Sequence, residues 1–134
     1  MGLSWTEIGE VMTDKQIGSH FKRSEFACKC GCGFDTVDVE LMPILEFVRF
    51  HFDKPVIINS ACRCEAHNAA VGGSKNSQHL RGRAADIRII GCTPDEIADA
   101  LESIMDGWGG LGVYPKHNFV HIDTRSGSPA RWRG

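Results

Sequence analysis

The sequence predicts an α+β fold in which helices flank a small, mostly antiparallel sheet. Helical patterns and strand-like patterns alternate only loosely along the chain, which is typical of this class. The length of 134 residues and the hydrophobic fraction of 42% suit one core of modest size. We therefore expect a single domain over residues 1–134, with an N-terminal extension over residues 1–20.

Charge and hydropathy argue against several classes of partner. The formal net charge is −2, which disfavours a nucleic acid or an anionic membrane as the main partner. No apolar run approaches the roughly 20 residues that a helix needs to span a bilayer. The first residues show no basic region followed by an apolar stretch, so we expect no Sec-type signal peptide.

The first long helical pattern covers residues 37–52, with Asp35 or Thr36 as its capping residue. Pro43 fits poorly in the interior of this helix and predicts either a kink or a later helix start. The apolar residues recur at three- and four-residue steps, so that one face is buried. These residues are Leu41, Ile44, Leu45, Val48 and Phe52.

The middle of the chain predicts two strands joined by a short helix and a loop. Residues 56–59 (VIIN) are apolar and mostly β-branched, as in a buried strand. A helix over residues 65–71 and a polar loop then lead to His79. Residues 83–90 (RAADIRII) predict the second strand, with Asp86 near its middle.

The C-terminal third begins with a strong helix start. Thr93 caps the helix, Pro94 takes its first position and Glu96 completes a capping box, and the helix runs to about Met105. The glycine-rich stretch WGGLGVYP predicts a turn and a strand, and residues 119–124 predict the last strand. The basic tail SGSPARWRG predicts irregular structure.

Six cysteines are many for this length. The first three alternate along the chain, as do the next two, so each cluster would present its thiols on one side of an extended segment. Three interpretations stay open: reduced buried thiols, disulfides formed after release, or a structural metal site built from both clusters. The cysteines are Cys28, Cys30, Cys32, Cys62, Cys64 and Cys92.

A candidate metal site arises from three polar residues in strand and loop positions. Two imidazoles and a carboxylate are a typical ligand set for a catalytic zinc, with a fourth position left for water. His79 and Asp86 in SQHLRGRAADI, with His121 in FVHID, provide this set. A carboxylate inside a strand is costly to bury unless it is paired or metal-bound. The alternative is that both histidines are structural.

Three further residues are candidates for the chemistry of the site. Arg63 follows the strand at residues 56–59, on a turn from which a charged group could point into a cleft. His117 and Tyr114 lie on the glycine-rich approach to His121. The alternatives are a solvated surface charge for Arg63, an exposed loop histidine for His117 and core packing for Tyr114.

The segments INSACRCEAHNAAVGGSKNSQHLRGRAADI, WGGLGVYPKHNFVHIDTR and ARW together resemble the zinc D-Ala-D-Ala carboxypeptidase family. That family includes phage peptidoglycan endopeptidases and the vancomycin-resistance D,D-dipeptidases. The resemblance covers roughly residues 20–133, and its S-x-H-x6-D element with a late H-x-D is specific. It implies a carboxypeptidase/hedgehog-like zinc peptidase fold and a zinc ion held by His79, Asp86 and His121. It also implies that Arg63 contacts the substrate carboxylate or the oxygen that becomes negative during attack.

One position departs from the pattern of that family. In its dipeptidase and endopeptidase branches, an acid three residues before the last histidine ligand serves as general base, and here that position is Asn118. The carboxypeptidase branch uses a Tyr-x-x-His arrangement, which Tyr114 and His117 match. We therefore expect His117 to transfer the proton. Asp123 is the second choice, unless it orients a metal ligand instead.

The predicted function is hydrolysis, by zinc-activated water, of an amide bond next to a D-amino acid in peptidoglycan stem peptides. The alternative is a catalytically inactive, zinc-containing cell-wall-binding or phage tail module, which Asn118 favours. The resemblance suits an endolysin-like bacteriophage enzyme. We expect a monomer, without nucleic-acid or membrane partners, that remains in the host cytoplasm until release or travels with the virion.

Overall fold

The computed structural model describes residues 16–134, so most of the predicted N-terminal extension lies outside the described residues. Short 3-10 helices are labelled η. The elements in chain order are η1 (Arg23–Phe26), α2 (Leu41–Phe52), β1 (Ile57–Ser60), α3 (Glu65–Ala70), η2 (Gln78–Arg81), β2 (Ala84–Arg88), α4 (Pro94–Glu102), β3 (Gly110–Tyr114), η3 (Pro115–His117), β4 (Phe119–Asp123) and β5 (Ala130–Arg133).

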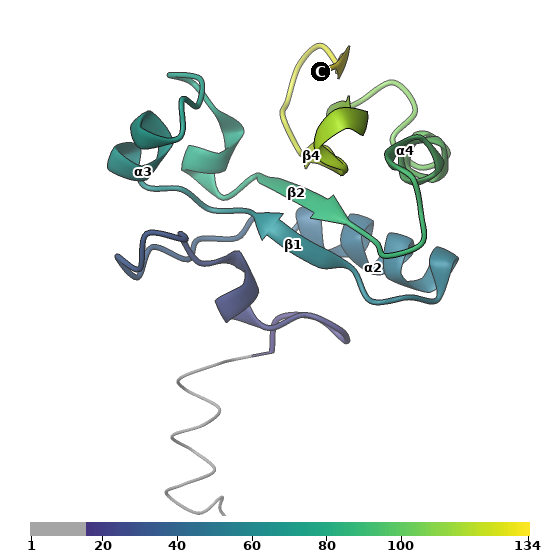
Figure 1. Ribbon diagram of the computed structural model, residues 1–134, viewed down its shortest axis with the longest axis horizontal. Helices are drawn as coiled ribbons and strands as arrows, with labels where there is room; N and C mark the ends of the chain where they lie inside the picture. Colours follow the sequence, from purple (N-terminus) through teal and green to yellow (C-terminus); the bar gives the residue numbers. More distant parts are fainter. Residues whose placement is uncertain (1–15) are drawn as a thin grey trace, which may run out of the picture.

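The sheet has five strands in the order β1-β2-β4-β3-β5. The pairs β1–β2, β2–β4 and β3–β4 are antiparallel, whereas β3 and β5 are parallel. The α+β class and the mostly antiparallel sheet are therefore confirmed, with the refinement that the sheet is mixed. Figure 1 shows α2 crossing behind β1 and β2, and α4 beside β4.

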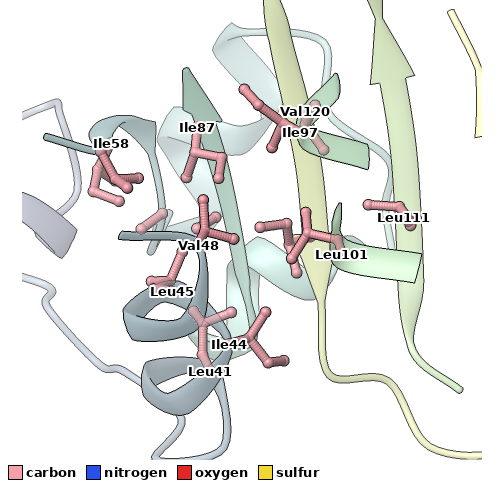
Figure 2. Packing of buried hydrophobic residues seen from close by; sticks show 14 of the residues in the cluster. Leu41, Ile44, Leu45, Val48, Ile58, Ile87, Ile97, Leu101, Leu111 and Val120 are labelled. Carbon is pink, nitrogen blue, oxygen red and sulfur yellow. The ribbon is translucent and has the colours of Figure 1, made fainter. Parts of the chain in front are cut away.

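The hydrophobic core lies between the sheet and the helices α2 and α4. From α2 it takes the apolar face predicted by the three- and four-residue spacing, and Leu41, Leu45 and Val48 are fully buried. Ile87 of β2 and Val120 of β4 meet these helices from the sheet (Figure 2). Burial of one such side chain contributes about 1.5–3 kcal/mol, so this layer holds the sheet in place.

Both long helices start where their proline residues can be tolerated. The helix α2 begins at Leu41 instead of residue 37, which puts Pro43 in the first turn, where its missing N–H would have no intrahelical partner. The later start predicted from Pro43 is confirmed, but Asp35 and Thr36 are not its caps. In α4, the Thr93 side chain accepts from the Glu96 N–H at 3.1 Å, as predicted.

No helix in residues 16–134 is both long and apolar enough to cross a bilayer.

The C-terminal tail is a strand, so the prediction of irregular structure there was wrong. Residues 130–133 form β5, which pairs with β3. Arg131 donates to the carbonyl oxygen of Gly109 at 2.8 Å, and Arg133 pairs with Asp95 of α4 at 2.7 Å. These ion pairs and hydrogen bonds let a basic segment serve as an edge strand, because its arginines find partners beside the sheet.

Candidate metal centre

A row of paired residues crosses the sheet and carries the candidate site. Asp86 of β2 pairs with His121 of β4, and His121 pairs with Gly112 of β3, which in turn lies opposite Trp132 of β5. Alternate residues of a strand point to opposite faces. These side chains therefore occupy the face away from the core, and Asp123 shares this face with His121, as predicted.

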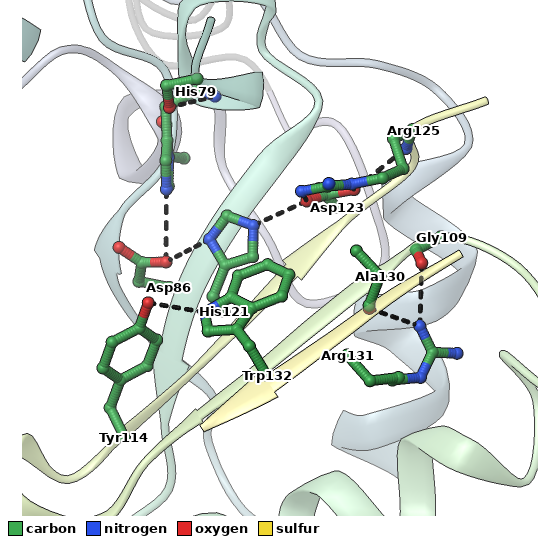
Figure 3. Close-up of polar contacts among 12 residues, drawn as sticks. His79, Asp86, Gly109, Tyr114, His121, Asp123, Arg125, Ala130, Arg131 and Trp132 are labelled. Carbon is green, nitrogen blue, oxygen red and sulfur yellow. Dashed lines mark hydrogen bonds and ion pairs between the residues drawn. The ribbon is translucent and has the colours of Figure 1, made fainter. Parts of the chain in front are cut away.

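The structure brings the three predicted metal ligands together (Figure 3). One carboxylate oxygen of Asp86, Oδ1, lies 3.3 Å from Nε2 of His79 and 3.0 Å from Nδ1 of His121. His79 reaches the sheet from η2, whose first turn is capped by Ser77. One ligand atom from each of the three residues falls within 4.8 Å of the others. Two nitrogens and one carboxylate oxygen in this space form a donor set that fits zinc.

The second nitrogen of each histidine is also held. Nδ1 of His79 lies 2.5 Å from the carbonyl oxygen of Ala61, and Nε2 of His121 lies 2.8 Å from Oδ2 of Asp123. A nitrogen that binds a metal must be unprotonated, so with a metal bound the other nitrogen would carry the proton and donate it to these oxygens. Histidine ligands of protein metal sites usually show this arrangement, which fixes both tautomer and ring orientation.

Charge at the centre is balanced by the same contacts. Burial alone would raise the pKa of Asp86, but hydrogen bonds from His121 and His79 outweigh it and hold that pKa well below its usual range. Burial alone would lower the pKa of His121, but its hydrogen bonds with Asp123 and Asp86 raise the pKa instead. Asp86 is thus an anion at neutral pH, as a metal-binding carboxylate must be.

Asp123 is fully buried and is held as an anion. Burial would raise its pKa, but hydrogen bonds from Arg125 and His121 hold the pKa well below the usual range. Arg125 makes two side-chain contacts to this carboxylate, at 2.8 and 2.6 Å. Asp123 does not line the cleft in front of the ligands. Its contact with His121 matches the orienting role that the sequence offered as an alternative, and a role in proton transfer stays a prediction.

A cleft of about 720 Å³ opens in front of the three ligands. Arg63 lines it and places Nη2 3.4 Å from Oδ2 of Asp86, the carboxylate oxygen that does not face the histidines. Ser60 and Asn68 accept hydrogen bonds from Arg63 at 3.2 and 3.3 Å. The guanidinium is therefore held beside the ligands and does not extend into bulk solvent.

Tyr114 also lines the cleft, where its hydroxyl accepts a hydrogen bond of 2.7 Å from the indole N–H of Trp132. The tyrosine ring stacks on Phe119 with centroids 4.4 Å apart. Because the hydroxyl is an acceptor in this contact, its own proton is directed elsewhere. Both Tyr114 and Trp132 are thus fixed before any ligand enters the cleft.

Trp132 and Arg125 are site residues that received no role from the sequence. The indole lies over Gly112, where an added Cβ would overlap the ring, and its centroid is 5.1 Å from that of His121. The Arg125 guanidinium lies 5.4 Å from the centre of the Trp132 ring, within cation–π range. The signals were present in the H-I-D-T-R and A-R-W segments, but only the pairing of β3 with β5 connects them.

His117 is placed differently from the other candidates. It is exposed at the end of η3 and does not line the cleft, so its role in proton transfer stays a prediction. Asn118 follows it with a left-handed backbone, φ 54°, which asparagine adopts more readily than most residues. Within the described residues, the imidazoles and the carboxylate that line the cleft belong to His79, Asp86 and His121.

Comparison with known proteins places this site in a family. The model of the family described as Peptidase M15 matches residues 19–123, most of the chain. The chain belongs to the peptidase M15 family. This is the zinc D-Ala-D-Ala carboxypeptidase family that the motifs predicted, and the prediction is confirmed. M15 enzymes are zinc peptidases, in agreement with the donor set of His79, Asp86 and His121.

Two curated relatives of this M15 peptidase carry functional names. The probable peptidoglycan L,D-endopeptidase MepK of Haemophilus influenzae is 41% identical over 63 residues, which cover 47% of this chain and 32% of the relative. The peptidoglycan L,D-endopeptidase MepK of Escherichia coli K12 is 40% identical over 83 residues, which cover 58% of this chain and 43% of the relative. The chain spans less than half the length of these relatives.

Proposed function

We propose that this M15 peptidase hydrolyses an amide bond next to a D-amino acid in peptidoglycan stem peptides, with zinc held by His79, Asp86 and His121. The observation that carries the proposal is the preorganised ligand set at the base of a cleft that also contains Arg63. The names of the two MepK relatives support peptidoglycan as the substrate. They also favour an internal bond between an L- and a D-residue over release of the C-terminal residue.

Zinc at this site would supply Lewis-acid activation of a water molecule and of the scissile carbonyl. The protein contributes rigidity, because Ala61 and Asp123 fix the two imidazoles before substrate binds. Fixed ligands and dipoles need no reorganisation during the reaction, which is a main source of enzymatic rate enhancement.

Arg63 and Tyr114 are the groups that would meet the substrate. The Arg63 guanidinium carries several N–H donors and can bind a carboxylate of the stem peptide or the oxyanion that develops during attack. The Tyr114 hydroxyl, which accepts from Trp132, has its proton available for a second hydrogen bond to the same oxygen. Both groups line the cleft with the three ligands.

Proton transfer needs a group that can both accept and donate a proton. His117 remains our candidate, since an imidazole can accept a proton from water and return it to the leaving amine. Its exposed position on η3 means that substrate binding would have to bring the reacting groups within its reach. This requirement makes the His117 variant informative.

The test is digestion of purified peptidoglycan, followed by mass spectrometry of the released fragments. The wild-type protein should produce new termini at one type of bond next to a D-residue, and His79→Ala should abolish the products. His51→Ala, which removes an exposed histidine on α2, is the matched control and should digest normally. If His117→Ala also digests normally, our assignment of the proton-transfer group is wrong.

The same experiment separates the enzyme from the inactive module. A wild-type protein that retains stoichiometric zinc and releases no fragment would favour the binding module that Asn118 suggested. Full digestion by a protein that contains no detectable metal after chelation would rule out the zinc mechanism. Products with only the terminal D-residue removed would replace the endopeptidase assignment with a carboxypeptidase.

A further inference from the structure

Four of the six cysteines come together beside β1, near the side on which η1 packs. Cys28, Cys30 and Cys32 lie in the turn that follows η1, and Cys64 is the N-cap of α3. Their four Sγ atoms all lie within 4.8 Å of one another. The chain therefore brings most of both cysteine clusters into one group, although Cys62 stays outside it.

The sulfur–sulfur distances match those of a tetrahedral metal site. Sγ of Cys28 lies 3.4 Å from Sγ of Cys30 and 3.8 Å from Sγ of Cys64, and Cys30 and Cys64 are 3.7 Å apart. Four thiolates at about 2.3 Å from a zinc ion stand about 3.8 Å from one another. A disulfide needs about 2.05 Å, so the observed spacing is that of ligands around an ion.

Backbone amides point at the sulfur atoms, as they do around metal-bound thiolates. The Cys64 N–H donates to Sγ of Cys28 at 3.4 Å, and the His67 N–H donates to Sγ of Cys64 at 3.4 Å. Hydrogen bonds to a sulfur ligand stabilise its charged form and fix its direction. The turn and the N-terminus of α3 thus supply partners for sulfurs that bear negative charge.

Exposure separates two members of the group, Cys30 and Cys32, from the cysteines outside it. Cys30 and Cys32 are exposed, so burial in the core does not explain their position. Cys62 is buried and Cys92 packs partly buried against the hydrophobic core, as small apolar residues do. The reduced, buried interpretation therefore suits Cys62 and Cys92 but not Cys30 and Cys32, whose sulfur atoms gather with those of the buried Cys28 and the half-buried Cys64.

We infer that Cys28, Cys30, Cys32 and Cys64 bind a structural zinc ion, separate from the His79, Asp86 and His121 site. Such a closed site with four thiolates leaves no position for water, which is characteristic of structural zinc. It joins the turn after η1 to the start of α3 by bonds that no core packing supplies. Because Cys64 is adjacent to Arg63, it also anchors the backbone from which Arg63 enters the cleft.

The test is the zinc content of the full chain, purified under reducing conditions and measured by mass spectrometry of the elements. The wild-type protein should hold two zinc ions per chain. Cys30→Ser and His79→Ala should each hold one, and the double variant none. Cys92→Ser, the matched control, should keep both, since Cys92 lies outside the group. Retention of the wild-type zinc content by Cys30→Ser would overturn the inference.

The two sites can fail independently in this experiment. A single zinc ion that Cys30→Ser loses and His79→Ala keeps supports the cysteine site and contradicts the catalytic one. The opposite result overturns the cysteine site alone. Iron in the place of zinc, lost with Cys30→Ser, would overturn the assignment of the metal.

A spectroscopic readout guards against variants that fail to fold. Cobalt(II) bound by the His79→Ala protein should show intense sulfur-to-metal charge-transfer absorption in the near ultraviolet, which nitrogen and oxygen ligands do not give. Cys32→Ser should weaken this absorption, and wild-type protein that shows none would overturn the inference. Detection of a disulfide between any two of the four cysteines in the freshly purified reduced protein would do the same.

Discussion

Nε2 of His121 lies 2.8 Å from the buried carboxylate of Asp123, two positions further along β4. The contact depends on the strand geometry, because residues two apart point to the same face. The H-x-D motif is thus one unit, in which a proposed metal ligand and the carboxylate that contacts it come from a single strand. Arg125 completes the unit by pairing with the same carboxylate.

Replacing Asp123 with asparagine should weaken zinc binding at the His79, Asp86 and His121 site by roughly 10- to 100-fold. The amide keeps the shape but loses the charge that holds the His121 tautomer and pairs with Arg125. The affinity is measured by competition with a chelator. The zinc ion of the histidine site is identified as the one that is missing from the His79→Ala protein. Asp95→Asn, which removes an exposed carboxylate paired with Arg133, is the control and should leave it unchanged.

Arg63→Lys and Arg63→Ala should both lower kcat for peptidoglycan fragments, by roughly 10²- to 10³-fold for alanine. Lysine keeps the charge but not the planar fork, so it should restore only part of the activity. Zinc content should be unchanged in both variants, because Arg63 contacts Asp86 on the oxygen away from the histidines. The same substitutions at the exposed Arg81 serve as controls. A normal kcat for Arg63→Ala would remove Arg63 from the mechanism.

Zinc affinity at the histidine site should fall as the pH falls, starting above the ordinary histidine pKa. Burial alone would lower the pKa of His121, but the hydrogen bonds with Asp123 and Asp86 outweigh burial and raise the pKa above its ordinary value. The metal-free ring therefore keeps its second proton up to a higher pH than an ordinary histidine. Zinc must displace that proton, and each displaced proton costs about tenfold in affinity per pH unit below this pKa. Titrations from roughly pH 5 to 8 would measure the slope. Affinity that does not change over this range would contradict the assignment.

Gly112→Ala should destabilise the fold by about 1–3 kcal/mol, because the new methyl group overlaps the Trp132 ring. Trp132→Ala should be destabilising as well, since it removes an aromatic side chain from the sheet. In the double variant the overlap is gone, so the two losses should not add. Urea unfolding of the four proteins gives the coupling free energy. Additive losses would show that the indole does not lie over Gly112 in solution.

Much of the site could be predicted from the sequence, because its ligands lie in local patterns. The carboxylate of Asp86 stood out inside an apolar strand, and the alternation of β4 put His121 and Asp123 on one face. The start of α4 could be predicted from the capping box that Thr93 and Glu96 form. In each case neighbouring residues along the chain carry the physical reason.

The parts that the sequence did not predict depend on contacts between distant segments. The strand β5 is short and basic, and its partner β3 lies in a parallel register that no hairpin turn indicates. The roles of Trp132 and Arg125 follow from that pairing. The cysteine group was only one of three open interpretations, because the C-x-C spacing says nothing about whether Cys64 reaches Cys28.

The alternation along β4 has a consequence for errors in folding. Val120 and Ile122 face the core, while His121 and Asp123 lie on the opposite face of the sheet, where the candidate metal centre lies. If β4 slipped by one position against β2, the side chains of His121 and Asp123 would enter the hydrophobic core, and those of Val120 and Ile122 would face the solvent. The alternation that places His121 therefore also specifies the register of β4 against β2. The same strand register thus sets both the packing of the core and the geometry of the candidate metal centre.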